Sequence, residues 1–164
     1  RLRLDLVLND FVYSALKENK IIIKSNGKPL RPLIDVEDMC QIINWSIKRK
    51  KKSFLLVNAG SNENNYSVKE IAEKVKEVLG NKVKILLNDK LPDDKRSYKV
   101  NFNKLNYNFK GFKPRHLKQT ILKLKKSVQI IVKSKHKKAD LIRLSYLGVL
   151  IKNRKLSSQL IWKK

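Results

Sequence analysis

Two arginines stand where their side chains could bind a diphosphate. Arg31 lies between Pro29 and Pro32, directly before an expected strand, so a restricted backbone would hold its guanidinium in one place. Arg96 lies in a polar loop at 93–98. Guanidinium groups make bidentate contacts to phosphate, and two that converge would form a diphosphate clamp. Spacing alone leaves a second interpretation open, in which both are ordinary surface arginines.

The other reactive residue types form no recognisable catalytic or metal site. His116 and His136 lie in basic segments, and we expect both on the surface. Cys40, the single cysteine, excludes an internal disulfide and is predicted to be a packed thiol on the apolar side of a helix. The acids at 93–94 indicate a solvated loop, and no glycine-rich phosphate loop is present. We therefore predict no catalytic, cofactor-binding or metal-binding residue in this chain.

The composition is that of a basic globular chain. Its 164 residues include 39 Lys or Arg and 14 Asp or Glu, and the 41% that are hydrophobic suffice for a folded core. Residues 1–100 have a net charge of +8 and residues 101–164 of +17. This excess is compatible with a nucleic-acid or anionic-membrane surface, but a lysine-rich coding bias is the preferred explanation. With no apolar run of about 18 residues and no signal peptide, we expect a cytoplasmic protein without a membrane partner.

Hydrophobic spacing predicts the elements that must position the two arginines. A helix capped by Asp5 is expected to end near Asn19 and to precede a β-branched strand at 21–23 and a glycine turn at 25–27. A second extended piece is predicted at 33–36, before an amphipathic helix that begins near Asp38.

The second half of the pattern begins with a strand at 54–60 that is apolar on both faces, as covered parallel strands are. Ser67 and Glu70 predict a capping box for a helix that ends at Gly80. A strand at 83–87, a short helix from 101 or 103, and basic helices at about 117–132 and 139–152 complete the chain. The order predicts an α/β fold with an incomplete sheet and a helix-rich basic C-terminus.

Several short segments, each weak alone, occur in one characteristic order. They are residues 21–27, RPLIDVED at 31–38, VNAG and YSVKEI within 57–71, DKRSY at 94–98 with Lys104, GFKP at 111–114, and the tail at 139–162. In this order they resemble the C-terminal half of the NAD-dependent epimerase/dehydratase family, the extended short-chain dehydrogenase/reductases. The resemblance covers the chain except about 123–138.

The resemblance implies the C-terminal part of a Rossmann-type fold that binds a nucleotide-diphosphate sugar. Arg31 and Arg96 would contact its two phosphates, whereas Leu6, Ile22 and Lys24 would line its base. NAD(P) would be bound mainly by an N-terminal half that also holds the catalytic Tyr-x-x-x-Lys pair, so we expect no cofactor for this chain alone.

Four further residues are interpreted through the same resemblance. Tyr13 and Lys17 have the four-residue offset of the catalytic pair but fall on the wrong helix, so we interpret them as helix-face residues. Asp38 would cap the helix after the Arg31 strand. Asp35 replaces the family's usual histidine.

We therefore expect a substrate-binding portion at 1–122, a basic linker or helix at 123–138 and a helical tail at 139–164. The chain alone would be inactive and aggregation-prone. Its expected partner is the missing N-terminal Rossmann half, and the parent would be a homodimer. Two alternatives remain: a basic nucleic-acid-associated module centred on 110–164, and a non-catalytic gene remnant. The preferred interpretation gives nucleic acid no role.

Overall fold

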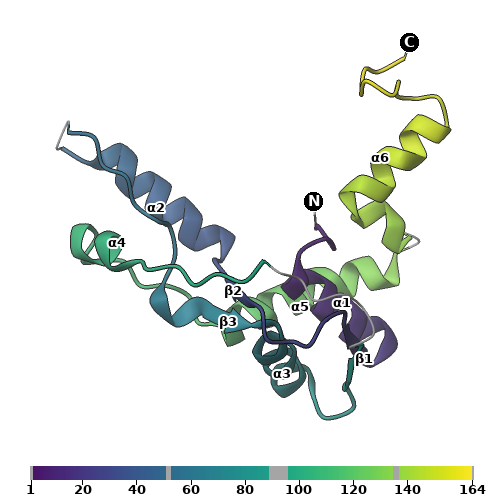
Figure 1. Ribbon diagram of the computed structural model, residues 1–164, viewed down its shortest axis with the longest axis horizontal. Coiled ribbons are helices and arrows are strands. Elements are labelled where there is room, and N and C mark those ends of the chain that lie inside the picture. Colours follow the sequence, from purple (N-terminus) through teal and green to yellow (C-terminus); the bar gives the residue numbers. More distant parts are fainter. Residues whose placement is uncertain (1, 51–52, 89–95, 135–136, 164) are drawn as a thin grey trace.

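The computed structural model describes residues 2–50, 53–88, 96–134 and 137–163. Helices α1, α3 and α5 surround strand β1, while α2 and α4 extend to one side and α6 to the other (Figure 1). The elements are α1 (Val7–Glu18), β1 (Lys20–Ile23), β2 (Leu30–Pro32), α2 (Val36–Lys48), the 3-10 turn η1 (Asn62–Asn64), β3 (Asn65–Ser67), α3 (Val68–Leu79), β4 (Lys84–Leu87), α4 (Asn103–Asn108), α5 (Leu117–Lys133), the 3-10 turn η2 (Lys138–Leu141) and α6 (Arg143–Lys152). The predicted α/β class is confirmed.

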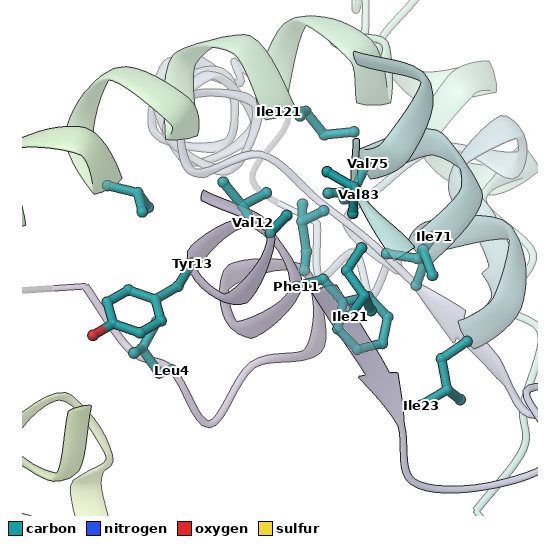
Figure 2. Packing of buried hydrophobic residues seen from close by; sticks show 14 of the residues in the cluster. Leu4, Phe11, Val12, Tyr13, Ile21, Ile23, Ile71, Val75, Val83 and Ile121 are labelled. Carbon is teal, nitrogen blue, oxygen red and sulfur yellow. The ribbon is translucent and has the colours of Figure 1, made fainter. Parts of the chain in front are cut away.

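The core lies where the apolar faces of α1, α3 and α5 meet β1 (Figure 2). Apolar residues three and four positions apart place one stripe of each helix toward the others. The fully buried side chains of this core include Val12, Ile21, Ile23, Ile71, Val75, Ile121 and Val128. Helix α5 runs unbroken across the predicted domain boundary at 122/123, and Val128, beyond that boundary, belongs to the core. The three-part division of the chain stays a prediction.

Two short sheets connect this core to the arginine strand. β1 pairs in parallel with β4, and β2 pairs antiparallel with β3, so that Arg31 lies opposite Tyr66. Between β1 and β2 the chain turns at Gly27, whose φ of +77° is left-handed and whose added Cβ would lie 3.0 Å from the Cβ of Lys69. The predicted glycine turn is therefore required both by backbone conformation and by the close approach of α3.

Three predictions at the N-terminal side are wrong in detail. Asp5 does not cap α1: Leu6 occupies the N-cap position, and the Asp5 carboxylate binds Arg3. The strand expected at 33–36 is β2 at Leu30–Pro32, because the three residues of β3 pair only with those positions. Asp35, rather than Asp38, caps α2 by accepting a hydrogen bond from the backbone N–H of Glu37 at 2.9 Å.

Two predictions that depended on burial are also wrong. Residues 54–60 form no strand, since no neighbouring strand pairs with them, and the side chain of Phe54 is 91% exposed. Cys40 is exposed on α2 rather than packed, because α2 contributes no residue to the described core cluster. The predicted helix at 139–152 is divided into η2 and α6.

The predicted capping box is confirmed at the start of α3. The Ser67 hydroxyl accepts from the Glu70 N–H at 3.1 Å, and the Glu70 carboxylate accepts from the Ser67 N–H at 2.7 Å. Gly80 ends the helix with a φ of +113°. The hydrogen bonds from the Ser67 backbone and side chain lower the pKa of Glu70.

We expect Glu70→Ala to lower the free energy of unfolding by about 1 kcal/mol at pH 7. Because folding lowers this pKa, the contribution is complete above the unfolded value of about 4.3 and is lost as pH falls through the folded pKa. Urea unfolding at pH 7 and at acidic pH measures this. Glu73→Ala, on the same helix, is the control; equal loss from both variants, or a loss independent of pH, would contradict the prediction.

Candidate functional site

The described residues line an open pocket of about 840 Å³ between the start of α1, strands β1 and β2, and the segment before α5. Leu6, Ile22, Lys24, Arg31 and Arg96 all line it. The fold therefore brings together the five positions that the sequence resemblance assigned to substrate binding. A pocket of this size is in the range that holds a small organic ligand.

The apolar part of the pocket wall follows from local structure. Successive residues of a strand point to opposite faces, so Ile21 and Ile23 enter the core while Ile22 faces away and is 40% exposed. Leu6 is 48% exposed at the N-cap of α1. Lys24 follows β1 directly and also lines the pocket.

Of the two predicted clamp arginines, Arg31 binds through its side chain to the backbone of Arg96. The Arg31 guanidinium donates from Nη1 to the carbonyl oxygen of Leu30 at 2.7 Å and to the carbonyl oxygen of Arg96. The Leu30 N–H donates to the Ser97 hydroxyl at 3.0 Å, so residues 96–97 are held against β2. The Tyr98 ring adds to this contact, with its centroid 6.0 Å from the Arg31 guanidinium carbon.

Each carboxylate in the pocket wall has a cationic partner. Asp5 binds Arg3, and this hydrogen bond lowers the pKa of Asp5. The Asp10 carboxylate lies 2.7 Å from the ammonium of Lys138. Both of these acids pair with residues that do not line the pocket, whereas Asp35, a third carboxylate in the wall, pairs with Arg115, which does line it. The cationic side chains of the wall include Lys24, Arg31 and Arg96, groups of the type that bind phosphate.

Arg115 and Tyr98 also line the pocket and were missed at the sequence level. The Arg115 Nε lies 3.7 Å from the Asp35 carboxylate, and its guanidinium pairs with Glu37. Its backbone N–H donates to the buried Asp38 carboxylate at 2.8 Å. These contacts fix the segment before α5 to the start of α2. A signal was available: Arg115 follows Pro114, much as Arg31 is flanked by prolines.

The remaining candidates within the described residues do not line this pocket. His116 is exposed at the N-cap of α5, as predicted, whereas His136 and the acids at 93–94 lie outside the described residues. Tyr13 is a buried residue of α1, and Lys17 donates to its hydroxyl at 3.0 Å, which raises the pKa of Lys17. In the described ranges, no three His, Cys, Asp or Glu side chains are grouped to hold a metal, and no helix has the length and apolar character to cross a bilayer.

No known family profile and no curated protein matches this sequence. Solved structures do match its fold. A similar one is TunA, an NAD-dependent NDP-hexosamine 5,6-dehydratase involved in tunicamycin biosynthesis, with 16% identity, a TM-score of 0.61, and coverage of 78% of this chain and 40% of that one.

Two further structures are similar to this chain over a comparable part of their own length. The dTDP-glucose 4,6-dehydratase from Bacillus anthracis, in complex with NAD, has 20% identity, a TM-score of 0.57, and coverage of 87% of this chain and 43% of that one. The UDP-Glc/GlcNAc 4-epimerase from Campylobacter jejuni has 19% identity, a TM-score of 0.57, and coverage of 79% and 42%. The chain thus spans less than half the length of these enzymes, and it has the fold of part of a Rossmann-type extended short-chain dehydrogenase/reductase.

Proposed function

We propose that this chain forms the nucleotide-diphosphate-sugar-binding part of an NAD(P)-dependent sugar-nucleotide epimerase or dehydratase. The observation that carries the proposal is the convergence of Leu6, Ile22, Lys24, Arg31 and Arg96 on one pocket. The names of the structural neighbours, which include dehydratases and an epimerase of nucleotide sugars, support the same class of ligand.

The cavity offers different chemistry to the two ends of such a ligand. Arg31 and Arg96 would bind the diphosphate through charge-assisted, bidentate hydrogen bonds. Leu6 and Ile22 would contact the flat faces of the base, with Lys24 at its edge. Binding at both ends orients the sugar between them and so reduces the entropic part of the reaction barrier.

The reacting groups would come from the rest of the parent protein. The five glycines of this chain form no glycine-rich loop after a strand, so these residues do not fit NAD(P). We therefore assign the cofactor to the N-terminal Rossmann half of the parent, which would complete this chain. Without that half the chain would be inactive, and the complete parent would be a homodimer.

The test is a calorimetric titration of the protein that carries this chain with UDP-, dTDP- and GDP-sugars. At least one should bind with a Kd below about 1 mM, the usual upper range for enzyme substrates. Free glucose should not bind, and inorganic pyrophosphate should bind more weakly than the nucleotide sugar. If the protein is folded by circular dichroism and binds none of the nucleotide sugars, the proposal is wrong.

A further inference from the structure

The C-terminal tail, residues 137–163, is fixed at one end to the body of the molecule. The Leu4 N–H donates to the carbonyl oxygen of Leu141 at 3.0 Å, and Leu141 is buried. The Lys138 ammonium contacts the Asp10 carboxylate at 2.7 Å and the Ser14 hydroxyl at 3.3 Å. From this attachment on α1, helix α6 leads away from the three-helix core (Figure 1).

The tail ends in a loop at 156–163 that is closed by its own hydrogen bonds. Leu156 and Trp162 form an antiparallel bridge, and the Lys163 N–H donates to the carbonyl oxygen of Lys155 at 3.0 Å. The Ser157 hydroxyl accepts from the Ile161 N–H at 3.2 Å. Leu160 has a left-handed φ of +63°, an unfavourable conformation for a residue with a Cβ atom. The backbone is therefore held in a defined turn.

This turn displays three consecutive large apolar side chains to solvent. Leu160, Ile161 and Trp162 are 54%, 62% and 68% exposed. On α6, Leu144 is 80% exposed as well. A closed loop that keeps its apolar residues outward, rather than folding them inward, is suited to insertion into an apolar phase.

The charge of the tail identifies the chemistry of its partner. Asp140 is the last acidic residue of the sequence. The basic residues that follow it within the described range are Arg143, Lys152, Arg154, Lys155 and Lys163. Basic groups that flank an exposed tryptophan and aliphatic residues match an anionic membrane interface, which offers phosphate headgroups above an apolar layer. Duplex nucleic acid would match the charge but not the apolar turn.

We propose that residues 143–163 bind peripherally to a lipid surface rich in anionic headgroups. Leu160, Ile161 and Trp162 enter the interface, and the surrounding lysines and arginines contact the lipid phosphates. This binding needs no spanning helix and is independent of the nucleotide-sugar pocket. It replaces the expectation, made from the sequence, that the protein has no membrane partner.

Sedimentation with lipid vesicles tests the proposal on the protein that carries this chain. Vesicles of phosphatidylcholine with phosphatidylglycerol should bind it at least about tenfold more tightly than phosphatidylcholine alone. Binding should weaken as salt screens the charges. Trp162 emission should shift to shorter wavelength on binding in a Trp45→Phe background, in which stacking on Phe109 is retained. The absence of binding to anionic vesicles at low salt would overturn the proposal.

Matched triple variants distinguish membrane binding by the tail from non-specific binding by exposed apolar residues elsewhere on the molecule. Replacing Leu160, Ile161 and Trp162 by serine should abolish the preference for anionic vesicles. Replacing Ile47, Phe54 and Leu56 by serine removes three apolar residues outside the tail that are even more exposed, and it should leave the preference for anionic vesicles intact. Equal loss from both triple variants would refute the assignment, as would equally tight binding of duplex DNA that the tail variant leaves unchanged. A nucleotide-sugar titration of each variant reports independently on the pocket.

Discussion

Replacing Arg31 by alanine is expected to weaken the binding of a nucleotide-diphosphate sugar by about 10- to 100-fold, because a charge-assisted hydrogen bond contributes about 1.5–3 kcal/mol. Arg31 lies in the pocket wall, held by the carbonyl oxygens of Leu30 and Arg96. Calorimetric titration of the variant and the unmodified protein measures the loss. Arg31→Lys should recover only part of it, since an ammonium group lacks the planar fork of guanidinium.

Two controls distinguish a phosphate contact from a purely structural role of Arg31. Arg154→Ala removes the same charge from an exposed position outside the pocket and should change the affinity less than about twofold. A nucleoside without phosphates should bind the Arg31→Ala variant as it binds the unmodified protein. If nucleoside binding falls to the same extent, Arg31 acts by holding residues 96–98 in place. If the affinity for the nucleotide sugar does not change, the assignment of Arg31 is wrong.

Replacing Ile121 by alanine is expected to lower the free energy of unfolding by about 2–5 kcal/mol. Ile121 is fully buried where α5 faces α1 and α3 (Figure 2), so its truncation removes apolar contacts and leaves a cavity. The midpoint of urea unfolding, with the slope of the transition unchanged, reports this loss.

Leu122 provides the matched control for this prediction because it is the next residue of α5 and is 42% exposed. Leu122→Ala should lower stability by less than about 1 kcal/mol, since much of the removed surface is already in water. Leu117 and Thr120, on the same helix, line the pocket. Destabilisation of α5 should therefore reduce the folded fraction that binds ligand. If Ile121→Ala and Leu122→Ala lower the free energy of unfolding equally, α5 does not pack as described.

Features that depend on neighbours along the chain could be predicted from the sequence. The Ser67–Glu70 capping box, the turn at Gly27 and the core-facing stripes of α1 and α3 follow from residues within four positions of one another. The position of Arg31 between Pro29 and Pro32 likewise predicted a backbone that restricts where its guanidinium lies. These local patterns were sufficient to indicate the α/β class.

Features that depend on a distant partner could not be predicted in the same way. The apolar pattern at 54–60 is typical of a strand covered on both faces. No strand of the described chain pairs with these residues, and Phe54 is exposed. Cys40 has the spacing of a buried residue but is exposed, because no residue of α2 belongs to the described core cluster. A hydrophobic period reports the face that could be buried, and only tertiary packing determines whether anything covers it.

Two acids at the start of α2 show most directly what local sequence cannot decide. Asp35 and Asp38 both have the residue type and position of a helix cap. The structure makes Asp35 the cap and buries Asp38 as the acceptor for the Arg115 N–H, 77 positions away. The contact of Arg31 with Arg96 spans 65 positions. The sequence by itself determined the local elements and the residue types able to bind an anion. Only the tertiary structure decided which of them share a pocket, because hydrogen bonds between distant segments leave no periodic trace along the chain.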